Sequence, residues 1–174
     1  MRNLNLITAI VFLLLFVQCS NAQNKQGMTT NSNNPYYSRT DTTHLKVPDS
    51  EWRKILSAGV YNIARQKGTE YAFSGKYWKT DVKGLYYCAV CGNPLFRSGA
   101  KFASSCGWPS FYETIRPNSV LYIPDDSHGM DRIEVQCGRC ESHLGHIFDD
   151  GPPPTGKRFC MNSAVLEFEP ENSK

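Results

Sequence analysis

The stretch Gly156–Phe168 carries the most suggestive chemistry of the sequence. Its aromatic and aliphatic residues follow a polar, proline-rich turn, a pattern that predicts a strand. Alternate residues of a strand share one face, so Arg158, Cys160 and Asn162 are expected side by side. A nearby cation favours the thiolate, which is the nucleophilic form of cysteine. Cys160 is therefore a candidate nucleophile, with a small buried thiol in a strand as the alternative.

Four further cysteines form two C-x-x-C pairs: Cys88, Cys91, Cys137 and Cys140. Each pair begins at the end of a predicted strand, and Gly92 and Gly138 allow a tight turn at each pair. Four thiolates in a tetrahedron suit a structural Zn²⁺ ion, one per chain, with no open position for a substrate. Disulfides within a pair would be strained, although disulfides between the pairs stay open. A Cys2His2 site with His143 and His146 would leave two of the four cysteines unused, so we reject it.

Cys106 is the other cysteine of the domain outside these pairs, in the turn-rich stretch Ser104–Phe111. A loop thiol facing the Cys160 thiol could take part in a two-step redox cycle, and a permanent disulfide between the two is an equal alternative. His143 and His146 follow the second C-x-x-C pair, and a histidine can exchange a proton near neutral pH.

The elements that must position these residues are mostly short. Helix signals begin at Pro48 and again at Ser57, and the second helix is expected to stop at Gly68. Short apolar segments separated by turn residues then predict an antiparallel, mainly-β domain. The candidate strands are Gly84–Cys88, Leu95–Phe102, Ser119–Ile123, Arg132–Cys137, Leu144–Phe148 and Phe159–Phe168.

Residues 1–22 read as an export signal, with Arg2 followed by an apolar run from Ile7 to Val17. The run is too short for a comfortable membrane span, which needs about 20 residues. Cys19 adds the alternative of a lipoprotein whose mature N-terminus is a lipidated cysteine. The sequence therefore predicts an exported protein of the periplasm or cell envelope, with membrane contact only through such an anchor.

Residues 23–46 are polar, with few aliphatic side chains, and are expected to form a flexible linker. The folded domain is expected over 47–170, with a short tail at 171–174. A hydrophobic content of 40% argues against a disordered chain. The net charge of +3, with mixed signs, gives no indication of nucleic-acid binding.

From about Val47 to Pro170 the chain resembles the type B methionine sulfoxide reductases, which reduce the R epimer of methionine sulfoxide, free or in proteins. The resemblance covers the whole expected domain. It is carried by Phe73-Ser74-Gly75, both C-x-x-C pairs, Cys106-Gly107-Trp108-Pro109-Ser110-Phe111, His143-Leu144-Gly145-His146, Phe148-Asp149-Asp150-Gly151-Pro152 and Arg158-Phe159-Cys160-Met161-Asn162-Ser163. Together these motifs are highly specific.

The resemblance implies a role for each candidate residue. Cys160 would attack the sulfoxide sulfur and become a sulfenic acid, with Arg158 favouring its thiolate. His143 and His146 would hold and protonate the sulfoxide oxygen. The remaining implied roles are positioning of the oxygen by Asn162, binding of the substrate methyl group by Trp108, and resolution of the sulfenic acid by Cys106.

The same resemblance implies a fold of two antiparallel sheets in a small barrel, with the zinc far from the chemistry. A thioredoxin-like donor would reduce the Cys106–Cys160 disulfide in the service of oxidative-damage repair, and we expect a monomer. The export signal departs from many relatives, which are cytoplasmic, and puts the identity of the donor in question.

Two other functional classes share part of this pattern. A zinc-ribbon binding module would not need Cys160, the two histidines and Asn162 together. A Cys-His hydrolase would turn over esters or peptides without consuming reductant. A zinc deaminase is excluded because no H-x-E motif is paired with P-C-x-x-C.

Overall fold

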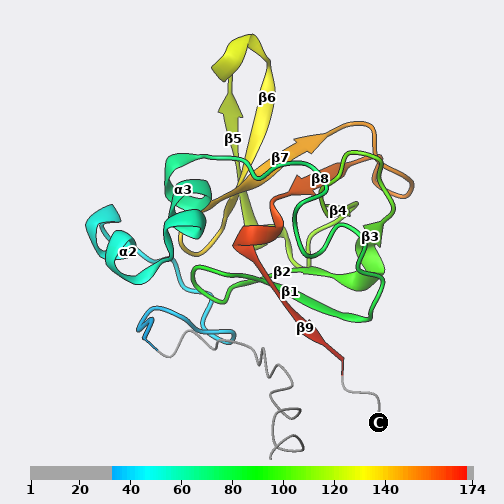
Figure 1. The fold of residues 1–174 in the computed structure, drawn as a ribbon. Helices are drawn as coiled ribbons and strands as arrows, with labels where there is room; N and C mark the ends of the chain where they lie inside the picture. Colours follow the sequence, from blue (N-terminus) through cyan, green and yellow to red (C-terminus); the bar gives the residue numbers. More distant parts are fainter. Residues whose placement is uncertain (1–32, 172–174) are drawn as a thin grey trace, which may run out of the picture. The chain divides into compact units, whose positions relative to one another are not determined.

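The computed structural model describes residues 33–171, which form two short helices and two antiparallel β-sheets (Figure 1). The expected export signal, Cys19 and the first part of the expected linker lie outside the described residues, as do residues 172–174. No helix in the described range is long and apolar enough to cross a membrane.

The two helices start where the sequence predicts. Helix α2 spans Asp49–Ile55 after Pro48, and helix α3 spans Ala58–Gln66, with the Ser57 hydroxyl accepting a hydrogen bond from the third residue of the helix. The expected stop at Gly68 is one residue late, because Lys67 adopts the left-handed conformation that ends α3, with φ of 56°. Gly68 then donates its N–H to the Asn62 carbonyl of α3 at 3.0 Å.

The smaller sheet has three strands in the order β2-β1-β9. Strand β1 (Gly84–Cys88) is central, between β2 (Pro94–Arg97) and β9 (Leu166–Pro170), and both pairings are antiparallel.

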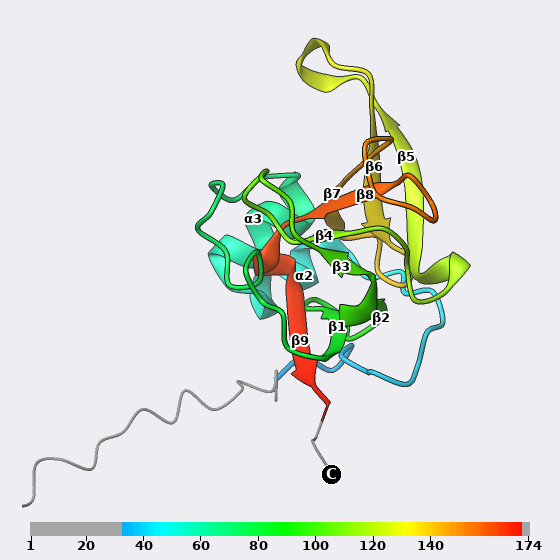
Figure 2. The same ribbon diagram turned by 90° about the vertical axis from the view of Figure 1, so that its right-hand side faces the viewer.

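The larger sheet has six strands in the order β3-β4-β8-β7-β6-β5. The strands are β3 (Lys101–Phe102), β4 (Ser110–Phe111), β5 (Val120–Asp125), β6 (Arg132–Cys137), β7 (His143–Phe148) and β8 (Arg158–Met161). In Figure 2 the β5–β6 hairpin extends beyond the other strands of this sheet. Strand β8 lies inside the sheet, where Cys160 is opposite Ser110 of β4 on one side and His146 of β7 on the other.

Two predicted strands are each broken by a crossing between the sheets. Leu95–Phe102 ends in the smaller sheet at Arg97, makes a 3₁₀ turn over Ser98–Ala100 and re-enters the larger sheet as β3. Phe159–Phe168 likewise leaves the larger sheet after Met161 and joins the smaller one as β9. Turn-forming residues stand at both breaks, Ser98-Gly99 and Asn162-Ser163, but a short turn inside a strand-like run does not show that the chain changes sheet.

Aromatic side chains from both sheets form the core between them. Phe96 of β2 stacks on Phe111 of β4, with ring centroids 4.3 Å apart and planes 11° apart. Tyr86 of β1 meets Phe111 edge-on at 5.0 Å, and all three residues are fully buried. Such pairs stabilise a fold beyond the area they bury, so they fix how the two sheets pack.

Residues 33–46 pack against both C-x-x-C turns instead of forming a free linker. The Asn34 amide donates to the Val90 carbonyl at 2.8 Å, and the Leu45 N–H donates to the Arg139 carbonyl at 2.7 Å. The polar side chains that suggested a linker are thus hydrogen-bonding partners here, and the packed part of the chain begins well before Val47.

Candidate active site and metal centre

Both C-x-x-C pairs come together at one buried point. The four sulfur atoms of Cys88, Cys91, Cys137 and Cys140 lie within 4.8 Å of one another. The Cys88–Cys140 and Cys91–Cys137 sulfur distances are 3.8 and 3.6 Å. Sulfurs bound to one tetrahedral ion at about 2.3 Å lie about 3.8 Å apart. A disulfide needs about 2.05 Å, so the arrangement fits a metal ion and not bridges between the pairs.

The glycine beside each C-x-x-C pair serves a different purpose. Gly92 adopts φ of 80° and makes the tight turn that the sequence predicts. In the second pair the left-handed residue is Glu141, with φ of 58°. Gly138 is required there for space, because a Cβ atom would lie 2.2 Å from the Asn118 carbonyl oxygen.

The two cysteines outside the metal cluster are neighbours. Cys160 is on β8 and Cys106 is in the loop before β4, and their sulfur atoms are 3.5 Å apart. Both side chains are partly buried and both thiols are free. The separation is short enough for a disulfide after a small movement of the Cys106 loop.

Ionisation favours Cys106 over Cys160 in this resting pair. Burial and the adjacent Cys106 raise the pKa of Cys160 to about 12, although Arg158 acts in the opposite direction. Burial also opposes ionisation of Cys106, but hydrogen bonds with Ser104, Ser110 and Cys160 lower its pKa to about 7. Arg158 favours the Cys160 thiolate in direction, as expected, but burial and the neighbouring Cys106 outweigh its effect on the pKa.

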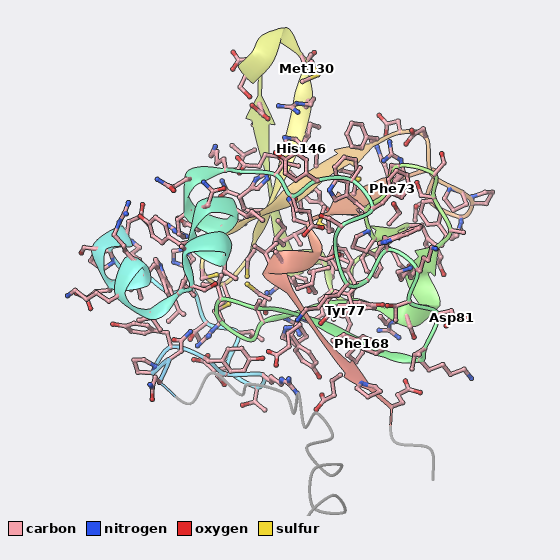
Figure 3. The ribbon with its side chains drawn as sticks, viewed as in Figure 1. Phe73, Tyr77, Asp81, Met130, His146 and Phe168 are labelled. Atoms are coloured by element: carbon pink, nitrogen blue, oxygen red, sulfur yellow. The ribbon has the colours of Figure 1, made fainter. Side chains whose placement is uncertain are left out.

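Each histidine of the pair has a carboxylate partner. His146 Nε2 is 2.7 Å from an Asp125 oxygen, and His143 Nδ1 is 2.7 Å from a Glu134 oxygen. Burial lowers the pKa of His143, so its ring is neutral near pH 7. Figure 3 shows His146 near the foot of the β5–β6 hairpin. His146 borders the open cleft described next, whereas His143 is buried beside Glu134.

A cleft of about 150 Å³ brings most of the predicted site residues together. Its walls include Trp108, His146, Phe148, Cys160 and Asn162. The apolar walls suit a thioether-sized group, and the thiol and imidazole suit a polar sulfoxide. The metal cluster contributes no side chain to this cleft.

Asn162 and Trp108 are both held by the backbone of Glu70. The Asn162 amide accepts from the Glu70 N–H at 3.0 Å and donates to the Leu144 carbonyl at 3.1 Å. The Trp108 indole donates to the Glu70 carbonyl at 3.2 Å. Asn162 therefore links the Glu70 loop to β7, in addition to any contact that it makes with a substrate.

Comparison with known proteins assigns the family. Residues 56–170 match the SelR domain family. A peptide methionine sulfoxide reductase MsrB of Thiobacillus denitrificans is 55% identical over 124 residues, which cover 71% of this chain and 94% of that protein. The chain belongs to the type B methionine sulfoxide reductase family.

Relatives from other organisms are similarly close. The proteins named MsrB of Pseudomonas fluorescens and Methanosarcina barkeri are 56% and 53% identical, covering 69% and 73% of this chain and 92% and 89% of those proteins. The solved Mis18 "Yippee-like" domain has 16% identity and a TM-score of 0.41 over 52% of this chain and 99% of that chain, too low to support an argument.

Three acidic residues that contact this reductase site are not predicted from the sequence: Glu70, Asp125 and Glu134. The Glu70 carboxylate accepts the backbone N–H groups of Ser163 and Ala164 at 2.6 and 3.0 Å, about ninety residues away in sequence. No local pattern can reveal such a contact. Glu134 is the one with a sequence signal, because an acidic residue inside a strand-like run is unusual. The run itself does not predict that its partner is His143.

We expect each chain to bind one divalent metal ion at the four cysteines, and Cys88→Ser to lose it. The variant should also melt at a markedly lower temperature, because metal binding at such a site contributes folding free energy. Elemental analysis and thermal unfolding of purified protein measure both effects. Cys106→Ser is the matched control, since it removes a thiol outside the cluster and should keep the metal. A metal-free wild type, with Cys88→Ser melting like wild type, would contradict the assignment.

Proposed function

We propose that this reductase acts on the R epimer of methionine sulfoxide, in oxidised proteins or free, with Cys160 as the nucleophile. Membership of the family supports methionine sulfoxide reduction in general. The observation that carries the finer proposal is the cleft in which Cys160, His146 and Trp108 meet, with Cys106 3.5 Å behind Cys160.

In the first step, Cys160 attacks the sulfoxide sulfur. The sulfoxide is reduced to a thioether as its oxygen passes to the Cys160 sulfur, which becomes a sulfenic acid. His146 is the cleft-lining group able to protonate that oxygen, and Asp125 fixes the orientation of its ring. Trp108 offers an apolar wall to the substrate methyl group.

In the second step, Cys106 displaces hydroxide from the sulfenic acid and forms a disulfide with Cys160. A thioredoxin-like dithiol donor then reduces this disulfide.

We further propose Zn²⁺ as the ion at the four-cysteine cluster. Four buried thiolates at tetrahedral spacing are the ligand set that this ion prefers in structural sites. With all four positions filled by protein, the ion would stabilise the fold and take no part in the redox step.

Stereospecificity tests the function directly. A fixed methyl-binding wall at Trp108 and a fixed proton donor at His146 can present only one sulfoxide hand to Cys160. With dithiothreitol as reductant, we expect turnover of the R epimer and at most trace turnover of the S epimer. Separate assays of the two pure epimers measure this, and equal rates would contradict the proposal.

A single-turnover assay, which measures methionine released per enzyme without reductant, should distinguish the roles of the two thiols. Cys160→Ser should release none, because a serine hydroxyl is scarcely ionised near pH 7 and is a poor nucleophile. Cys106→Ser should release about one methionine per enzyme and then stall with a thioredoxin-type donor. Small thiols could restore partial turnover by reducing the sulfenic acid directly.

Two results would overturn these roles. A full single-turnover yield from Cys160→Ser would place the nucleophile elsewhere. Unchanged multiple turnover of Cys106→Ser with the protein donor would remove its resolving role.

We also propose that the protein is exported, on the basis of the charged and apolar pattern of residues 1–22. The mature chain should then begin at Gln23 or at a lipidated Cys19. Mass spectrometry of protein from the native membrane and soluble fractions distinguishes these two forms. Mature material that retains Met1 would refute export.

A further inference from the structure

Hydroxyl groups gather around one sulfur of the reactive pair. The Ser104 Oγ lies 3.1 Å from the Cys106 sulfur and donates a hydrogen bond to it. The Ser110 Oγ lies 3.5 Å from the same sulfur. A sulfur that accepts such hydrogen bonds is stabilised as the thiolate, because a thiolate is the stronger acceptor. The Trp108 carbonyl oxygen, 3.6 Å from this sulfur, is the opposing contact, because it can only accept a hydrogen bond from the thiol form.

Ser104 is the better placed of the two hydroxyls. Its oxygen accepts the backbone N–H of Cys106 at 3.3 Å, which leaves its own proton free to point at the sulfur. The Ser110 hydroxyl also contacts the Trp108 carbonyl at 3.3 Å, so its proton has a competing acceptor.

Charged groups near the pair do not reverse this preference. Arg158 attracts negative charge on either sulfur, but it is held by Asp150 through contacts of 2.7 and 2.8 Å. His146 lies opposite Cys160 on β7 and is paired with Asp125. The Glu70 carboxylate on the neighbouring loop is occupied by backbone N–H groups.

We propose that the Ser104 hydroxyl keeps Cys106 ionised beside a protonated Cys160, so that Cys106 accepts the Cys160 proton as Cys160 attacks. This inference rests on the proposed function and gives Cys106 a second task, as a base before it resolves the sulfenic acid. Cys106→Ser should therefore keep the single-turnover yield of about one methionine per enzyme but reach it with a smaller rate constant. Ser104 is then a positioning residue that acts through Cys106.

The direction of the proton transfer is physically reasonable because the two ionisations are coupled. Much of the resistance of Cys160 to ionisation comes from burial and from the negative charge on Cys106. Once the proton has moved to Cys106, that repulsion disappears, while the attraction of Arg158 remains.

The proton count closes over both steps. In the first step, the Cys160 proton passes to Cys106, a second proton from His146 goes to the oxygen, and the S–O bond of the sulfoxide breaks as Cys160 gains the oxygen. The products are methionine, a Cys160 sulfenic acid and a Cys106 thiol.

In the second step, the Cys106 sulfur bonds to the Cys160 sulfur, and the Cys106 proton leaves with the hydroxyl group as water. The donor dithiol then restores one thiol and one thiolate, and one proton returns to His146.

The test is the pH dependence of alkylation at each cysteine in the metal-loaded enzyme. Iodoacetamide labelling followed by peptide mass spectrometry gives a separate curve for Cys106 and Cys160, each scaled to its own plateau at high pH. In wild type we expect a Cys106 midpoint near pH 7 and a Cys160 midpoint far above it.

Three variants isolate the Ser104 hydroxyl. Ser104→Ala should raise the Cys106 midpoint by about one pH unit, which slows labelling below the midpoint about tenfold. Ser104→Thr retains a hydroxyl and should keep the wild-type midpoint. Ser105→Ala is the matched control, since Ser105 is the exposed neighbour in the same loop and should also keep it. Metal content and melting temperature confirm that each variant is folded.

The pH profile of the single-turnover rate constant should move with the Cys106 midpoint in Ser104→Ala. The inference is overturned if Cys160 is labelled first in wild type, or if Ser104→Ala leaves the Cys106 midpoint unchanged. Those results are distinguishable from failure of the proposed function, in which wild type releases no methionine from the R epimer.

Discussion

The position of β8 inside the six-stranded sheet is the constraint on which the site depends. Its pairing with β7 places Cys160 opposite His146, and its pairing with β4 places Cys160 opposite Ser110. Opposed residues of antiparallel strands point to the same face, so the Cys160 thiol and the His146 imidazole share one side of the sheet. A slip of one residue would turn Cys160 to the other face, toward the core.

The crossing from β8 to β9 joins this site to the rest of the fold. Asn162 follows β8 directly, and its buried amide binds both the Glu70 backbone and the Leu144 carbonyl of β7. The same turn lets β9 pair with β1, which ends at the first cysteine of the metal cluster. The cluster can therefore stabilise the smaller sheet without contributing to the cleft.

The two free thiols differ in how readily they ionise. Burial suppresses the charge of Cys160, whereas hydroxyl groups in the loop favour charge on Cys106. Because the thiolate is the form that oxidants attack, this difference makes Cys106 the more readily oxidised of the two thiols.

The sequence by itself determined the metal ligands, the candidate nucleophile, the family and the mainly-β class. Cysteines in C-x-x-C spacing and a continuous motif such as Arg158–Ser163 are local signals, because the residues that define each of them are close in sequence. The strands Gly84–Cys88 and Arg132–Cys137 were predicted with their observed ends, because each run stops at the first cysteine of a C-x-x-C pair.

Only the tertiary structure decided where two predicted strands break, how residues 33–46 pack, and which thiol is the more acidic. The breaks depend on which sheet offers a free edge, and the packing of residues 33–46 depends on carbonyls of both C-x-x-C turns. The acidity of the thiols depends on burial and on hydroxyl groups within about 3.5 Å of the Cys106 sulfur. These quantities arise from contacts between distant segments, and no local pattern of residues contains them.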